Sequence, residues 1–135
     1  AWVLGSADQP HTWTTTHDTA RLLVELASDE RAHGQAWLVP SAPPRTMREA
    51  LGDIADAAGT ATPTVRVLGP RTVRAVGLAV PMMREPAGTS YQFTAPFVID
   101  DAATRALVGW APEDWDQTLS RVVACARGTD QVRAR

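Results

Sequence analysis

The sequence predicts an α/β protein in which short strands alternate with helices. Short β-branched and aromatic segments recur along the chain, and amphipathic segments with helix-capping residues lie between them. The chain has 135 residues, of which 44% are hydrophobic and 21% are charged, as is typical of one globular domain. We find no repeat and no linker, so we expect one domain over residues 1–128 and a frayed tail over residues 129–135.

The first strand is expected at Trp2–Leu4, where a β-prone run is closed by Gly5. Residues 11–16, "HTWTTT", are β-branched and aromatic and predict a second strand. A helix should follow, with Asp18 as its N-cap and Gly34 as its C-terminal stop. The apolar stripe that should face the core consists of Ala20, Leu22, Leu23, Leu26 and Ala27.

The next segments are a strand within residues 35–40, "QAWLVP", and a helix that ends near Ala58. Thr46 and Glu49 form the capping-box pattern that opens this helix. Residues 65–68, "VRVL", alternate apolar and charged side chains, which predicts a strand with one buried face.

Pro70 stands where the first turn of a further helix tolerates proline. The inward face of that helix should consist of Val73, Val76, Leu78 and Val80. Residues 84–96 are expected to be irregular. Asp100 or Asp101 can cap a helix over residues 102–108, and a last amphipathic helix is expected over 114–127.

Composition excludes several classes of function. The formal net charge is −2, which argues against a nucleic-acid surface. All 13 basic residues are arginine, so the chain has no Schiff-base lysine, no Walker A lysine and no Tyr–Lys catalytic pair. The absence of lysine and asparagine is typical of GC-rich genomes such as those of actinobacteria.

No apolar run approaches the roughly 20 residues that a membrane span needs, and the first residues do not read as a signal peptide. We therefore expect a cytoplasmic protein without membrane contact. The single cysteine, Cys125, rules out an internal disulfide and is expected to be a small core residue.

Three stretches carry a family resemblance: "HTWTTTHDTARLL" at 11–23, "AWLVPSAPPRTMREAL" at 36–51 and "PFVIDDAATRALVGWAP" at 96–112. Their order and spacing resemble the C-terminal, substrate-binding part of an extended short-chain dehydrogenase/reductase of the NAD-dependent epimerase/dehydratase family. The likeness spans about residues 1–128, and Val108 interrupts the "LGW" that the family often shows. The resemblance implies a Rossmann-type α/β fold that lacks its nucleotide-binding half.

The family's catalytic and cofactor-binding parts are missing from this sequence. The glycines never fall as G-x-G-x-x-G, and Tyr91, the only tyrosine, has Ala95 where the family's Tyr-x-x-x-Lys motif has lysine. We therefore expect no cofactor in this chain, with NAD or NADP bound by the complete enzyme. A chain that starts within a strand favours a fragment of a longer enzyme over a stand-alone relic.

Two histidines and an aspartate, His11, His17 and Asp18, raise the question of a metal or acid–base site. A zinc site needs three or four ligands, and His33 lies a whole helix away, so we expect no metal. We interpret this stretch as the junction between a strand and a helix. Asp18 then has a structural role as a helix cap, and we expect no catalytic residue in this chain.

The better candidate for function is "PMMREPAGTSYQF", residues 81–93, which by resemblance lines the substrate pocket. Its flexible and polar side chains suit a small-molecule substrate. The predicted substrate-binding residues are Met82, Met83, Arg84, Tyr91 and Gln92. The alternative is a loop that merely covers a helical layer.

Three functions remain open at this point. The first is the substrate-binding portion of an NAD(P)-dependent oxidoreductase or epimerase, with the missing nucleotide-binding half or a second copy as partner. The second is a non-enzymatic binding or assembly module that docks on a separate Rossmann-type protein. The third is a cofactor-independent acid–base catalyst that uses Tyr91 with Glu85 or a histidine. If the chain is cut free from a missing half, we expect an exposed apolar surface and self-association or binding to that half, with Trp13, Trp37 or Leu38 at the contact.

Overall fold

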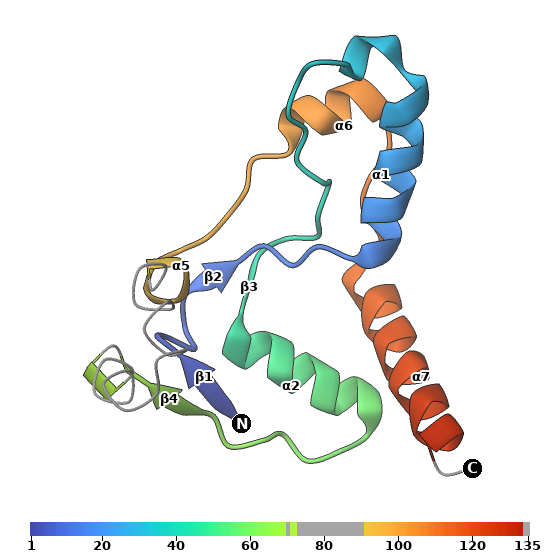
Figure 1. The fold of residues 1–135 in the computed structure, drawn as a ribbon. Helices are drawn as coiled ribbons and strands as arrows, with labels where there is room; N and C mark the ends of the chain where they lie inside the picture. The colour runs from blue at the N-terminus through green and yellow to red at the C-terminus, as the bar shows by residue number, and fades with distance from the viewer. Residues whose placement is uncertain (70, 73–90, 134–135) are drawn as a thin grey trace. The chain divides into compact units, whose positions relative to one another are not determined.

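The computed structural model describes residues 1–69, 71–72 and 91–133 of the chain. These residues form a small mixed α/β protein with short strands, as the sequence predicts (Figure 1). Residues 71–72 are helical, whereas the rest of the helix predicted after Pro70 and the first part of the irregular segment lie outside the described residues.

The chain divides into two compact units. Unit 1 combines residues 1–11 with 44–98, and unit 2 combines residues 12–43 with 99–135. Each unit is therefore built from two stretches that are distant in the sequence.

Within the described part of the chain, unit 1 contains the strands together with α2 and α5. Its elements are β1 (Trp2–Leu4), β2 (Pro10–His11), β3 (Arg45–Thr46), α2 (Met47–Ala58), β4 (Arg66–Leu68) and α5 (Tyr91–Thr94). β1 pairs with β4 in parallel, and β2 pairs with β3 in an antiparallel orientation (Figure 1). The strands predicted at residues 2–4 and 65–68 are confirmed.

Helix α2 forms as the local sequence predicts. The Thr46 side chain accepts the N–H of Glu49, and the Glu49 carboxylate accepts the N–H of Thr46, so both halves of the capping box are present. Gly59 ends the helix with a φ of +66°, a conformation that glycine adopts without strain. The inner face of α2 is small, because its buried residues are Ala50 and Ala55.

The strand β4 is more exposed than predicted. Val67, which should lie on its buried face, is 42% exposed, while Val3 opposite it on β1 is buried. Of this pair, Val3 is therefore buried, whereas Val67 lies at the surface of unit 1.

Unit 2 is helical over its described residues. Its elements are α1 (Thr16–Ser28), the 3₁₀ turn η1 (Glu30–Ala32), α6 (Ala102–Val108) and α7 (Trp115–Arg133). The predicted helix over 102–108 is confirmed, and α7 continues past its predicted end at residue 127. The larger apolar residues buried in this unit are Leu22, Trp115, Leu119 and Val123.

The start of α1 differs from the prediction. Residues 12–15 are not a strand; they lead directly into the helix, and Thr15 is the N-cap, whose side chain accepts the N–H of Asp18. The predicted strand over 11–16 is thus limited to His11 within β2, because the Thr15 hydroxyl caps α1 and the helix already begins at Thr16. Asp18 lies one turn inside the helix, so its predicted role as N-cap is wrong.

The strand predicted within residues 35–40 is absent, since these residues join no ladder in the described chain. Their polar contacts are local instead: Trp37 donates its Nε1–H to the carbonyl of Ala32 at 2.8 Å. An extended segment becomes a strand by pairing with a neighbour, and sequence propensity does not supply that neighbour.

Several side chains expected in the core lie at the surface, among them Ala20 and Ala27 of α1. Cys125 on α7 is exposed. On α1, Leu22 is buried, but Leu23 is 63% exposed, so the apolar stripe of this helix is divided between a buried and a solvent-facing side. None of the helices in the described residues is long and apolar enough to cross a bilayer.

Candidate functional site

The candidate site lies in unit 1, at the carboxyl end of the parallel pair β1 and β4. The two strands run in register, with Leu4 opposite Leu68, and each is followed by a glycine. The N–H of Gly5 donates to the Leu68 carbonyl at 3.0 Å and closes this end of the ladder. Open α/β sheets bind their ligands beyond the carboxyl ends of their strands.

Helix α5 packs directly against this end of β1. Gly5 has a φ of +76°, and a Cβ atom at this position would lie 2.7 Å from the carbonyl carbon of Phe93. Only glycine fits such a close approach, because any side chain would meet the main chain of α5. The residue that closes β1 therefore also determines how near α5 can lie.

A second contact to α5 comes from the imidazole ring of His11. Its Nε2 lies 2.6 Å from the main-chain carbonyl oxygen of Gln92, and its Nδ1 lies 2.9 Å from that of Gln9. The next segment continues the contact, because the N–H of Phe97 donates to the Pro10 carbonyl at 2.9 Å. His11 thus joins β2 to α5 across 81 positions of sequence.

The structure brings together two of the predicted substrate-binding residues. Tyr91 and Gln92 open α5, and the Gln92 amide nitrogen lies 3.5 Å from the Tyr91 hydroxyl. Tyr91 is 59% exposed, so its hydroxyl is accessible to a ligand, whereas Gln92 is half-buried. The other three predicted residues, Met82, Met83 and Arg84, lie outside the described residues.

Sequence reasoning missed Gly5 and His11 as parts of this site. Their residue types and positions mark Gly5 as the end of one strand and His11 as the start of the next, but their contacts with residues 92 and 93 could not be read from spacing. The available signal was a glycine directly after a strand, which often marks a close backbone approach.

His17 and Asp18, which the sequence grouped with His11, lie in unit 2, where Asp18 links distant segments of the chain. The buried carboxylate of Asp18 accepts the hydroxyl of Thr15 at 3.0 Å and the N–H of Glu113 at 3.1 Å. His17 is exposed beside it, with Nδ1 3.7 Å from Asp18. Within the described residues, no group of three or more His, Cys, Asp or Glu side chains could hold a metal ion.

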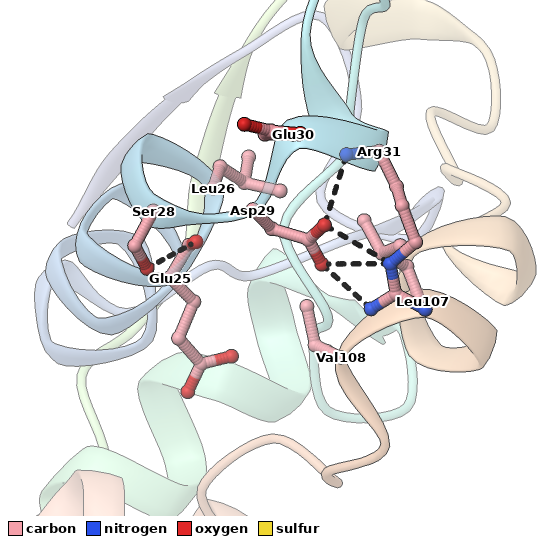
Figure 2. Close-up of a pocket in the computed structure, with 8 residues that line it drawn as sticks. All are labelled: Glu25, Leu26, Ser28, Asp29, Glu30, Arg31, Leu107 and Val108. Carbon is pink, nitrogen blue, oxygen red and sulfur yellow. Dashed lines mark hydrogen bonds and ion pairs between the residues drawn. The ribbon is translucent and has the colours of Figure 1, made fainter.

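Unit 2 also contains a cleft of about 460 Å³ between the end of α1, η1 and α6, which the sequence did not suggest (Figure 2). Its lining residues are Glu25, Leu26, Ser28, Asp29, Glu30, Arg31, Leu107 and Val108. In Figure 2 the guanidinium of Arg31 contacts both carboxylate oxygens of Asp29. The hydrogen bond from Arg31 lowers the pKa of Asp29.

A neighbouring carboxylate, that of Glu25, is also engaged by the protein. It accepts the indole N–H of Trp110 at 2.6 Å and the Nε–H of Arg21 at 3.2 Å. The Arg21 guanidinium in turn lies 4.2 Å from the Trp110 ring centroid. The polar groups of the cleft are thus largely used for internal contacts, which makes the edge at α5 the better candidate site.

No protein-family model matches this chain, and a search of curated proteins found no match.

Proposed function

We propose that this chain is the substrate-binding portion of an NAD(P)-dependent oxidoreductase or epimerase of the extended short-chain dehydrogenase/reductase type. The observation that carries the proposal is the position of α5, which places Tyr91 and Gln92 beside the carboxyl end of β1. The same two residues belong to the stretch that, by resemblance, lines the substrate pocket of that family.

The two side chains suit an uncharged polar substrate group. The Tyr91 hydroxyl and the Gln92 amide can each donate and accept a hydrogen bond. Alcohol, ketone and sugar oxygens match such groups, and nicotinamide-dependent enzymes interconvert alcohols and ketones by hydride transfer. Met82, Met83 and Arg84 complete the proposed substrate-binding set.

The described residues do not fit a dinucleotide. The turn that follows β1 begins with one glycine, Gly5, and the main chain of Phe93 occupies the space beside it. A phosphate cradle needs several glycines and free N–H groups at the start of a helix. The proposal therefore assigns the cofactor and the proton and hydride transfers to a nucleotide-binding half that this chain lacks.

The cofactor part of the proposal is tested by calorimetric titration of the chain with NADH and NADPH. We expect no binding and no dehydrogenase activity from the chain alone. A dissociation constant below about 100 μM would contradict this, because it requires about 5.5 kcal/mol of favourable free energy.

The substrate part is tested with 3-fluorotyrosine, which labels one position because Tyr91 is the only tyrosine. Cyclohexanol, cyclohexanone and glucose are titrated while the fluorine resonance is recorded. We expect at least one of them to move the resonance, and the Gln92→Leu variant to weaken that response. The proposal would be contradicted if none of the three probes moved the fluorine resonance at concentrations up to about 100 mM, which is far above the usual KM values of enzymes for their substrates.

The alternative function, a binding module that docks on a separate Rossmann-type protein, is favoured by the outer face of α1. Leu23 and Val24 are 63% and 73% exposed, and Ala20 and Ala27, one turn to either side, are also exposed. Residues at this spacing share one face of a helix. By contrast, Trp13 and Trp37, two of the residues expected at a contact surface, are partly buried.

Sedimentation of the purified chain at about 100 μM separates the two functions when it is combined with the fluorine titration. If α1 is a docking face, Leu23→Glu should abolish association and binding of a hydrophobic dye. Val122→Glu changes an apolar residue on α7 that is also exposed, at 47%, and is the matched control. If association depends on Leu23 and no probe moves the Tyr91 fluorine resonance, the docking module is favoured over the substrate-binding portion.

A further inference from the structure

Helix α5 cannot hold its own position. It comprises four residues, Tyr91–Thr94, and the N–H of Ala95 donates to the Tyr91 carbonyl at 3.0 Å. Helices of this length are not stable in isolation, because nucleation fixes several dihedral angles for one hydrogen bond. The location of the Tyr91 hydroxyl therefore depends on what holds α5 from outside.

Three contacts between described residues hold this segment against residues 5–11. The main chain of Phe93 lies on Gly5, the N–H of Phe97 donates to the Pro10 carbonyl, and the His11 ring reaches the Gln92 carbonyl. The first two contacts are made by main-chain atoms. The third is made by a side chain, and it attaches within α5 itself.

We propose that His11 is the positioning residue of the candidate site. Its ring lies between the carbonyl oxygens of Gln9 and Gln92, and it thereby fixes α5 at the carboxyl end of β1. His11 acts through the main chain of α5, and the substrate contacts are left to Tyr91 and Gln92. The consequence for ligand binding rests on the proposed function, whereas the positioning of α5 can be measured without a ligand.

The chemistry of the two partners explains why a histidine suits this place. Carbonyl oxygens only accept hydrogen bonds, so a hydrogen bond to either of them is donated by a ring N–H. An imidazole presents nitrogens on two sides of one rigid ring, and these lie 2.9 Å from the Gln9 carbonyl oxygen and 2.6 Å from that of Gln92. A glutamine at position 11 has one amide nitrogen and can donate a hydrogen bond to the Gln92 carbonyl, whereas a leucine can donate to neither carbonyl.

The experiment compares three variants that carry 3-fluorotyrosine at Tyr91: His11→Leu, His11→Gln and His33→Leu. His33 is an exposed histidine of unit 2 and serves as the control. Two signals are followed: the fluorine resonance, and hydrogen exchange at the Ala95 amide, which is bonded to Tyr91. Whichever of cyclohexanol, cyclohexanone and glucose binds the wild-type chain is then titrated into each variant.

We expect His11→Leu to move the fluorine resonance and to accelerate exchange at Ala95 about tenfold, the effect of one lost hydrogen bond. Affinity for the probe should fall by a similar factor. His11→Gln should restore part of each signal, and His33→Leu should leave all of them unchanged. Partial rescue by glutamine is the signature of a bond to the Gln92 carbonyl, since a general packing role would not distinguish the two variants in this way.

The positioning role is overturned if His11→Leu leaves the resonance and the Ala95 exchange as they are in the wild-type chain. Should His11→Leu fail to fold, His11→Gln decides, because equal exchange in the glutamine variant and the wild type would also overturn the role. If His11 variants move the resonance while no probe binds the wild type, the proposed function is wrong and the positioning of α5 stands. If a probe binds the wild type and the His11 variants equally well, the positioning role is wrong and the proposed function stands.

Discussion

In each unit, segments that are distant in the sequence are held together, but different chemical groups make the contacts in unit 1 and in unit 2. In unit 1 the joining atoms are mainly those of the main chain. β1 and β4 share a parallel ladder, the N–H of Phe97 donates to the Pro10 carbonyl, and Gly5 contacts the backbone of Phe93. These contacts tolerate many side chains but little change in the path of the backbone.

In unit 2 buried or half-buried carboxylates make the corresponding contacts. Asp18 accepts the N–H of Glu113, 95 positions away, and Asp101 accepts the N–H of Ser41. Arg105 completes the second group, since it donates to both the Asp101 carboxylate and the Ser41 carbonyl. Unit 1 should therefore be sensitive to changes in backbone freedom, and unit 2 to loss of charge and to acid.

The largest effect is expected from Gly5→Ala in unit 1. A left-handed φ costs a non-glycine residue roughly 1 kcal/mol or more, and the clash with Phe93 adds overpacking of similar or greater size. We expect a loss of about 3 kcal/mol in the free energy of unfolding. Denaturant unfolding followed at the fluorine label on Tyr91 measures it within unit 1.

Gly59→Ala is the matched control for this prediction. Gly59 also has a positive φ, +66°, but a Cβ atom there would meet nothing within 4 Å. Its substitution should cost about 1 kcal/mol. Equal losses at Gly5 and Gly59 would mean that the close approach of α5 contributes nothing, and the comparison between the units would lose its main support.

The sequence predicted the elements whose determinants are local. The helix α2 was readable because Thr46 and Glu49 lie at its start, and both act as expected. At α6 the N-cap is Asp101, which makes no side-chain cap bond; the neighbouring Asp100 carboxylate accepts the N–H of Ala102, and Gly109 ends the helix. Capping chemistry involves neighbours three or four positions apart, so a single sequence reveals it.

The remaining features depend on partners that are remote in the sequence. Residues 35–40 have the composition of a strand but find no ladder, and the outer face of α1 looks like core but is exposed. The candidate site shows the same limit. Tyr91 and Gln92 could be proposed from residue type, whereas the contacts of His11 and Gly5 arise from tertiary structure across more than 80 positions.

The second prediction concerns Asp18 and the side-chain contacts of unit 2. Asp18→Ala removes a buried carboxylate that accepts two hydrogen bonds and leaves the N–H of Glu113 without that partner. We expect a loss of about 2 kcal/mol. The Tyr91 fluorine resonance of unit 1 should not change. Unfolding is measured by tryptophan fluorescence, because four of the five tryptophans lie in unit 2.

Thr15→Ala gives the control for Asp18, since it removes the N-cap of the same helix and should cost about 1 kcal/mol. An Asp18→Ala variant that loses no more than Thr15→Ala would show that the long-range bond to Glu113 adds little. In that case the helix cap, and not a buried carboxylate, would account for the stability of this joint.

The smallest expected effect is an acid sensitivity of unit 2 that comes from Asp101. The hydrogen bonds from Arg105 and, to a lesser extent, from the Ser41 N–H hold the pKa of the Asp101 carboxyl below its ordinary value of 3.8. A carboxyl with a lowered pKa in the folded state stabilises the fold above the ordinary value, and this contribution is lost as the pH falls toward the lowered pKa. Tryptophan fluorescence during denaturant unfolding should therefore show that the wild type loses stability between about pH 5 and pH 3 faster than Asp101→Asn, which cannot titrate. If the free energy of unfolding fell equally with pH in the two proteins, Asp101 would not make the stability of unit 2 depend on pH. The contrast with unit 1 would then rest on Asp18 alone.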